Sequence, residues 1–289
     1  MSNFEERSAR VAIAQMAIVT CDIEANVKLC LELVDKAIEQ KVDLLVFPEL
    51  SLTGYDVEGH VEELARTTSS PEIQKFVDAS VDGPSMMIGF IENGGDGFYY
   101  NAAAYIEQGA VVHVQRKLYL PTYGVLSEAR LFCAGERFTS FPTRFGKMAM
   151  LICEDAWHTS LPYLAVMGGA TILLTVSASP TGGTSADVTS EELWTAVNRA
   201  TAVQLKVFNI YANLVGSEGN IRYWGGSHII SPSGKIVAKG PIEEEAFITT
   251  DIDLNTVDRQ RYAFRYVQDE RMSTTLRELQ LLANNRWGN

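Results

Sequence analysis

The chain has 289 residues, of which 46% are hydrophobic and 21% are charged, as in an ordinary globular protein. Lys and Arg number 24 and Asp and Glu number 36, a formal charge of −12, and no basic cluster occurs that could neutralise nucleic-acid phosphates. The longest apolar runs, Val11–Val19 and Ile172–Val176, are too short or too interrupted to span a bilayer, and residues 1–10 lack the apolar core of a secretory signal. We therefore expect neither a nucleic-acid partner nor a membrane location.

The four cysteines, Cys21, Cys30, Cys133 and Cys153, form no C-x-x-C pair and no spacing with histidine that is typical of a zinc site. Without a secretory signal, a disulfide framework is not expected. The sequence predicts a cytoplasmic protein without a metal or cofactor.

The first fifty residues have a strand–helix–strand pattern. Val11–Met16 is an apolar, partly β-branched run, and Val42–Phe47 is a nearly all-apolar run that ends at Pro48. Between them, Ile23–Gln40 repeats apolar residues at helical spacing. Such a unit usually forms adjacent parallel strands.

The middle of the chain contains strand-like runs separated by turns rich in Asn and Gly, which indicate hairpins. A further apolar strand precedes a predicted helix over Asp155–Met167. The predicted strands of this part are Met86–Ile91, Tyr100–Ile106, Val111–Leu118 and Met148–Ile152.

The remaining sequence repeats the strand–helix–strand rhythm and ends with a hairpin, over the ranges Thr171–Val176, Leu193–Leu205, Val207–Ala212, His228–Ser231 and Lys235–Val237. The two halves predict an α/β protein with mixed sheets packed as a sandwich and helices outside. We expect one domain over residues 1–289, with a core of about 9–271 and a tail of 272–289 that has helical spacing. Pro180–Ser190 is predicted to be a long loop. Loops of this length in compact domains often act as functional lids.

Three polar residues stand where predicted buried strands end. Glu49 follows Val42–Phe47, Lys117 lies near the end of Val111–Leu118, and Cys153 follows Met148–Ile152. This edge of an α/β sheet is where ligands bind. A cation lowers the pKa of a thiol and stabilises an oxyanion, and a carboxylate can move the protons of an acyl transfer. Position alone also allows non-catalytic roles for these residues. Cys153 could be an inert core cysteine, Glu49 could cap a helix, and Lys117 could form a surface ion pair.

The segments around these residues, Phe47–Tyr55, Arg116–Pro121 and Leu151–Trp157, resemble the three motifs of the nitrilase (carbon–nitrogen hydrolase) superfamily. The resemblance extends from about Val11 to Arg271. It implies an α-β-β-α sandwich of two mixed sheets with helices on the outer faces. It also implies a Glu49–Lys117–Cys153 catalytic triad and a homodimer or higher homo-oligomer.

Within the superfamily, the motifs are most similar to the glutaminase domain of glutamine-dependent NAD synthetase. This similarity implies that Glu128 positions Lys117 or the substrate, that Tyr55 and Tyr123 line the substrate entrance, and that the Glu154 N–H completes an oxyanion hole. Ser177 and Ala178 would edge the acyl pocket.

The sequence also departs from both relatives. It lacks the Ser-Gly-Gly-x-Asp-Ser loop of the synthetase domain, so a complete NAD synthetase is not expected. It also lacks the Trp-Glu-Asn pattern that follows the cysteine of nitrilases, which disfavours nitrile hydrolysis.

The leading hypothesis is hydrolysis of a small linear carboxamide to carboxylate and ammonia through a Cys153 thioester. The alternatives are an N-carbamoyl-amine hydrolase, a stand-alone glutaminase-type subunit and a binding module without catalysis. A papain-like Cys–His hydrolase would need a histidine close to Cys153, and His158 is expected to face away along the same helix.

Overall fold

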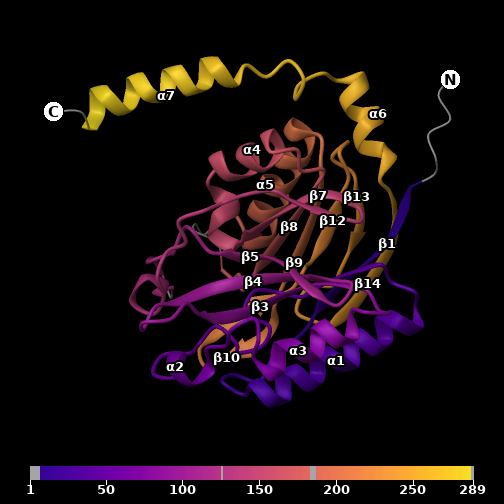
Figure 1. Cartoon of the computed structure of the whole chain (residues 1–289), viewed down its shortest axis with the longest axis vertical. Helices are drawn as coiled ribbons and strands as arrows, with labels where there is room; N and C mark the ends of the chain where they lie inside the picture. Colours follow the sequence, from indigo (N-terminus) through magenta and orange to yellow (C-terminus); the bar gives the residue numbers. More distant parts are fainter. Residues whose placement is uncertain (1–6, 125, 183–186, 288–289) are drawn as a thin grey trace.

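The computed structural model of the chain describes residues 7–124, 126–182 and 187–287. Within them, two six-stranded sheets pack face to face between layers of helices (Figure 1). The strand orders are β14-β1-β2-β3-β4-β5 and β13-β12-β9-β8-β7-β6. The predicted α/β class and the α-β-β-α sandwich with two mixed sheets are confirmed.

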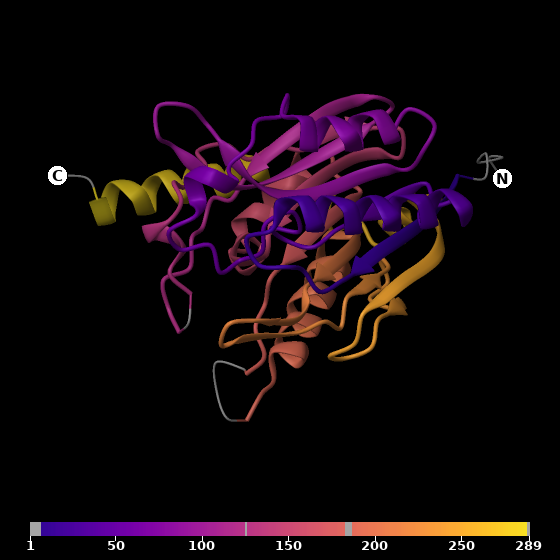
Figure 2. The same cartoon turned by 90° about the horizontal axis from the view of Figure 1, so that it is seen from below.

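The first sheet has three parallel strands at its centre, β1, β2 and β3, with antiparallel neighbours on both sides. β14, from late in the chain, pairs with β1 along its whole length, and Figure 2 shows this orange strand beside the indigo one. Helices α1 and α3 cover the outer face (Figure 1). The bounds are β1 (Ser8–Gln15), α1 (Ile23–Glu39), β2 (Leu44–Val46), α2 (Val61–Leu64), α3 (Pro71–Ala79), β3 (Ser85–Asn93), β4 (Tyr99–Glu107), β5 (Ala110–Arg116) and β14 (Ala246–Asp253).

The second sheet repeats this plan, because β7, β8 and β9 are parallel and their outer neighbours are antiparallel. Helices α4 and α5 cover its outer face, and α6 and α7 end the chain. The bounds are η1 (Glu128–Arg130), β6 (Phe141–Thr143), β7 (Gly146–Ile152), η2 (Cys153–Trp157), α4 (Ser160–Met167), β8 (Ile172–Ser177), α5 (Ser190–Leu205), β9 (Phe208–Asn213), β10 (Val215–Glu218), β11 (Ile221–Trp224), β12 (His228–Ile230), β13 (Ile236–Lys239), α6 (Asn255–Ala263) and α7 (Met272–Trp287).

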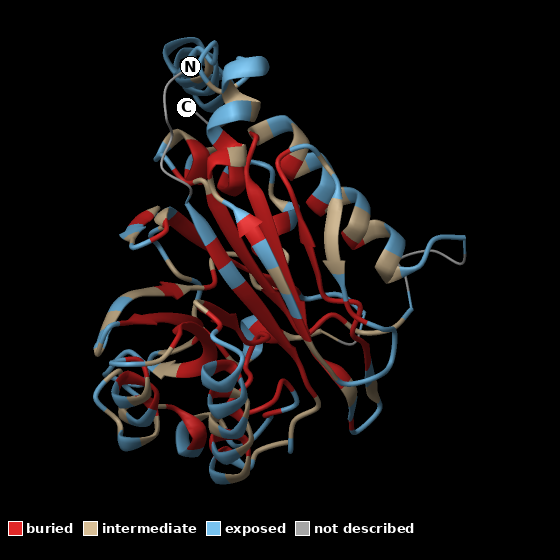
Figure 3. Cartoon of the chain, turned by 90° about the vertical axis from the view of Figure 1, so that its right-hand side faces the viewer, coloured by how far each residue is buried: buried red, intermediate tan, exposed pale blue. Residues whose placement is uncertain are grey.

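Alternating side chains of the central strands hold the layers together. In β1, Val11 and Ile13 pack into the apolar layer between the sheets, whereas Ala12 and Ala14 pack toward α1. This is the period of two that a strand buried on both faces requires. Figure 3 shows the consequence, since the strands are mostly buried and the C-terminal helices mostly exposed.

The continuous helix predicted over Asp155–Met167 is wrong. The chain instead forms the 3₁₀ turn η2, leaves it at His158, and begins α4 at Ser160. Pro162 explains the break, because proline lacks the N–H of an interior helical residue and clashes with the preceding turn, so it is accommodated in the first turn of α4.

The C-terminal tail forms α7, which stands clear of the sheets in Figure 1. Part of the predicted loop Pro180–Ser190, residues 183–186, lies outside the described residues, and a lid role for this loop stays a prediction. Among the described residues, no helix has both the length and the hydropathy needed to span a bilayer.

Gly89 of β3 provides a test of how tightly this sheet holds the segment after β2. A Cβ at Gly89 would lie 2.4 Å from the Leu50 nitrogen and 2.7 Å from the Pro48 oxygen, both backbone atoms that cannot move aside. We expect Gly89→Ala to lower the free energy of unfolding in urea by about 3 kcal/mol. Gly94→Ala is the control, because its Cβ would meet chiefly the movable Tyr100 ring, and it should cost less than about 1 kcal/mol. If both variants lost the same free energy of unfolding, the tight contact between Gly89 and the segment after β2 would be contradicted.

Candidate active site

Strands of both sheets deliver the three predicted catalytic residues to one end of the sandwich. Glu49 follows β2, and Lys117 directly follows β5, both in the first sheet. Cys153 directly follows β7 in the second sheet. The packing of one sheet on the other therefore brings the thiol to the two charged groups.

The Lys117 ammonium lies between two carboxylates. Its Nζ is 2.7 Å from Glu49 Oε1 and 2.6 Å from Glu128 Oε1. All three side chains are buried, with Lys117 fully so. Burial alone would lower the pKa of Lys117, but the charges of Glu128 and Glu49 outweigh it and raise that pKa well above the usual value. Burial, and then the charge of Glu49, raises the pKa of Glu128 despite the nearby ammonium.

Two further donors fix the Glu49 carboxylate. The Ala178 backbone N–H donates to Glu49 Oε2 at 2.7 Å, and the Asn101 side-chain amide donates to Oε1 at 2.7 Å. The same Asn101 nitrogen lies 3.4 Å from Glu128 Oε2, so it bridges the two carboxylates. Asn101, which lies inside β4, was not among the predicted site residues.

Cys153 sits at the turn where β7 becomes η2. Its φ of +48° is in the left-handed region, which is rare for a residue other than glycine and is associated with functional strain. The Ser177 hydroxyl donates to its Sγ at 3.3 Å. Burial, and then the charge of Glu49, raises the pKa of the thiol well above the usual range, and the Lys117 charge opposes this only in part. The resting thiol therefore keeps its proton.

The entrance position predicted for Tyr55 is wrong. Its ring is buried, and its hydroxyl donates to Glu128 Oε1 at 2.8 Å. Its backbone N–H donates to the buried carboxylate of Glu218, which turns the side chain toward the interior. Tyr55 thus supports Glu128 from behind.

The prediction that Ser177 and Ala178 edge a pocket also needs correction. Both are buried, Ser177 at the end of β8 and Ala178 directly after it, and they bond to Cys153 and Glu49, respectively. The next residue, Ser179, is the one that reaches the cavity wall.

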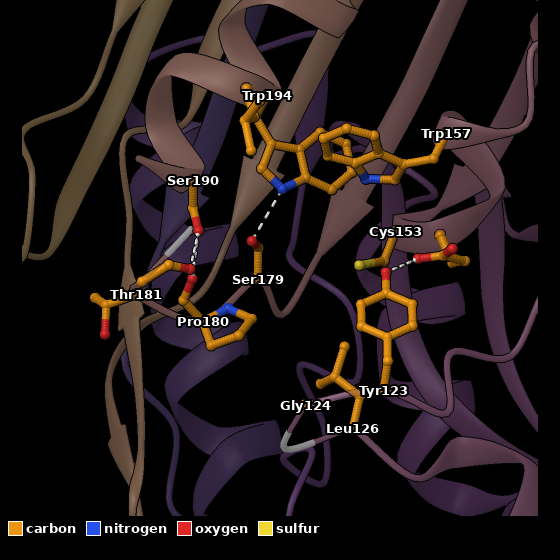
Figure 4. A pocket seen from close by; sticks show the side chains of 13 residues that line it. Tyr123, Gly124, Leu126, Cys153, Trp157, Ser179, Pro180, Thr181, Ser190 and Trp194 are labelled. Carbon is orange, nitrogen blue, oxygen red and sulfur yellow. Dashed lines mark hydrogen bonds between the residues drawn. The ribbon is translucent and has the colours of Figure 1, made fainter. Parts of the chain in front are cut away.

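A cavity of about 530 Å³ opens beside Cys153 (Figure 4). Tyr123 lies beside the thiol in this view, Glu154 also lines the cavity, and the Tyr123 hydroxyl donates to Glu154 Oε2 at 2.5 Å. Trp157 and Trp194 form an apolar wall, with ring centroids 5.1 Å apart. Sequence reasoning missed both tryptophans, since each resembles an ordinary core aromatic.

Asp155 joins the cysteine turn to the strand end that carries the lysine. Its carboxylate is fully buried and accepts the backbone N–H groups of Leu118 and Tyr119 at 3.0 Å and of Ile152 at 3.2 Å. Burial raises the pKa of Asp155 to about 7 in spite of these donors.

The histidines do not supply a Cys–His pair in the described structure. The His158 ring stacks on Tyr119 with a centroid distance of 3.3 Å, and His228 is hydrogen-bonded to Asn198 and to the Gly226 carbonyl. Within the described residues, no group of three or more His, Cys, Asp or Glu side chains is arranged to hold a metal ion.

Comparison with known proteins decides the family. Residues 10–262 match the family model described as carbon-nitrogen hydrolase. The chain belongs to the carbon–nitrogen hydrolase family. The chain is therefore a hydrolase of this family, and Glu49, Lys117 and Cys153 stay its predicted catalytic residues.

Two curated relatives show the range of this family. The chain is 33% identical over 255 residues to a glutamine-dependent NAD(+) synthetase of Thermotoga maritima, covering 85% of this chain and 42% of that protein. It is 27% identical over 281 residues to a protein of Schizosaccharomyces pombe named as a probable nitrilase, covering 94% of this chain and 98% of that protein. The chain therefore spans less than half of the synthetase and nearly all of the nitrilase-type relative.

A solved structure confirms the fold. It is a mutant amidase of Nesterenkonia sp. AN1, which has an acetamide moiety added covalently at its active-site cysteine. The TM-score is 0.79 at 22% identity, covering 93% of this chain and 96% of that chain.

The Asp155 contacts predict a pH-dependent stability. Asp155→Asn places an amide group against backbone donors and should lower the free energy of unfolding by about 1–3 kcal/mol. The folded pKa of about 7 exceeds the ordinary value of 3.8, so between these values the native state holds a proton that the unfolded chain has lost. The contribution of Asp155 to stability therefore falls as pH rises through this window.

Urea unfolding at pH 5 and pH 8 measures this effect. The difference in free energy of unfolding between the wild type and Asp155→Asn should be larger at pH 5 than at pH 8. Asp82→Asn, at an exposed carboxylate, is the control and should change stability by less than about 0.5 kcal/mol at both values. An equal penalty at pH 5 and pH 8 would contradict the raised pKa.

Proposed function

We propose that this carbon–nitrogen hydrolase cleaves a carboxamide to a carboxylate and ammonia through a thioester on Cys153. The observation that carries the proposal is the buried Lys117 ammonium, held by Glu49 and Glu128 behind a thiol that opens onto a cavity. An acid–base group, a cation and a nucleophile at one site are what acyl transfer requires.

The first step couples deprotonation to attack. Because the pKa of the Cys153 thiol is raised, Glu49 takes its proton as the sulfur bonds to the amide carbon. The carbonyl oxygen then becomes an oxyanion, which Lys117 and the Glu154 N–H stabilise. Collapse of this tetrahedral intermediate breaks the C–N bond, and Glu49 returns the proton to the nitrogen, which leaves as ammonia.

The second step releases the acid. Glu49 removes a proton from a water molecule as its oxygen bonds to the thioester carbon. The new intermediate collapses, the C–S bond breaks, and the proton on Glu49 restores the thiol. Throughout both steps Glu128 positions Lys117 and Asn101 positions Glu49.

The second candidate is release of the carbamoyl group from an N-carbamoyl amine, which uses the same steps. The carboxylate of Glu154 on the cavity wall favours it, since a basic amine would bind beside an acidic group. The glutaminase-type relatives supply the third candidate, in which the amide is glutamine.

Cys153→Ala tests the proposed nucleophile. This variant should lose at least about 10³-fold in ammonia release from simple amides, because no other group can form the thioester. Cys133→Ala removes a free thiol outside the cavity and is the control, with activity near that of the wild type. Mass spectrometry with a slow substrate should find the acyl adduct on the Cys153 peptide. Continued turnover by Cys153→Ala, with native circular dichroism, would end the proposal.

We also propose that the protein works in the cytoplasm as a homodimer. All four cysteines are free thiols in the structure, which suits a reducing compartment. Met272, Leu276 and Leu279 recur at helical spacing on α7 and are more than half exposed. An apolar stripe of this kind suits helix packing against a second copy.

Substitution on α7 tests the dimer. Leu276→Glu combined with Leu279→Glu places charges in the stripe and should shift the mass measured by light scattering from dimer to monomer. Leu281→Glu changes a leucine that is 50% exposed on the opposite side of the helix and should leave the dimer intact. A wild-type monomer at micromolar concentration would contradict the proposal.

A further inference from the structure

The cavity beside Cys153 carries one kind of charge. Glu154 is the only charged side chain among the described residues that line it. No arginine or lysine of the described lining is therefore available to pair with an anion.

Lys117 does not fill this role. Its side chain is fully buried, and its ammonium is engaged by two carboxylates at 2.7 and 2.6 Å. In the proposed reaction this ammonium faces the oxyanion of the amide under attack. A carboxylate at the far end of a substrate would lie away from it.

Much of the remaining wall of the cavity is apolar, and its polar side chains, those of Tyr123, Ser179, Thr181 and Ser190, carry hydroxyl groups rather than charges. The Trp194 indole N–H donates to Ser179 Oγ at 2.9 Å, so the ring presents carbon to its surroundings. Trp157 packs edge-on against Trp194 and is 37% exposed, an aromatic surface that a ligand can cover. Leu126, Pro180 and Leu193 extend the apolar lining.

We infer that the substrate is an amide whose apolar aliphatic or aromatic body ends in a neutral or positively charged group, and that an amide ending in a carboxylate is rejected. The inference rests on the proposed amide hydrolysis and narrows its substrate. A far carboxylate would lose its hydration without gaining a cation and would face the Glu154 carboxylate. A far ammonium could donate to that carboxylate in a charge-assisted hydrogen bond.

A matched set of six-carbon amides tests this selectivity. Ammonia release is measured for hexanamide, 6-aminohexanamide and adipic acid monoamide, which differ chiefly at the far end. We expect kcat/KM for hexanamide and 6-aminohexanamide to exceed that for the monoacid by about 100-fold or more. Glutamine has an ammonium as well as a carboxylate at its far end, and it should be a poorer substrate than 6-aminohexanamide because its carboxylate lacks a cation to pair with.

Glu154→Gln isolates the carboxylate, because it keeps the backbone N–H and the side-chain shape. The ratio of kcat/KM for 6-aminohexanamide to that for the monoacid should fall by at least about 10-fold. Glu39→Gln removes an equal charge at an exposed position of α1 and should leave this ratio unchanged.

The outcomes separate the two ideas. If no amide releases ammonia and Cys153 forms no acyl adduct, the proposed function fails and the inference fails with it. If hexanamide is hydrolysed but the monoacid or glutamine is hydrolysed equally well, amide hydrolysis stands and the inference is overturned. An unchanged ratio in Glu154→Gln would overturn it as well.

Discussion

The site depends on one buried ammonium. Removing Lys117, Glu49 and Glu128 from water costs several kcal/mol for each ion, and only close pairing with full hydrogen bonding repays that cost. The ends of β2 and β5 and the turn η1 must therefore converge within hydrogen-bond distance. Asn101 and Tyr55 complete the shell, which leaves the carboxylates little freedom to reorient.

The thiol reaches this cluster from the other sheet, so the apolar layer between the sheets is part of the catalytic geometry. Side chains of β1, β2, β7 and β8 fill that layer and fix the distance between the strand ends. Asp155 adds a polar tie, because it binds the residues after Lys117 and the residue before Cys153 at the same time. A change in sheet packing would thus displace the nucleophile relative to its base.

Sequence pattern could locate the triad but not its surroundings. Glu49, Lys117 and Cys153 each end a recognisable apolar run, and such ends meet at the edge of a sheet. Asn101 lies inside β4 and Trp194 inside α5, where nothing in the local pattern tells which way a side chain points. Tyr55 was misplaced for the same reason, since its direction is set by Glu218, 163 positions away in sequence. Long-range contacts of this kind leave no local periodicity.

The charges around Cys153 determine when the nucleophile can form. A thiolate in the resting site would be buried next to Glu49, with a single ammonium already shared by two carboxylates. In the proposed amide hydrolysis, transfer of the thiol proton to Glu49 neutralises one carboxylate as the sulfur becomes negative, so the net charge of the site does not change. Bonding to the amide carbon then moves that charge onto the carbonyl oxygen, beside Lys117. Under the proposed mechanism the thiolate forms only while an acyl carbon is in place to accept it, and the buried ammonium acts on the oxyanion rather than on the free thiol.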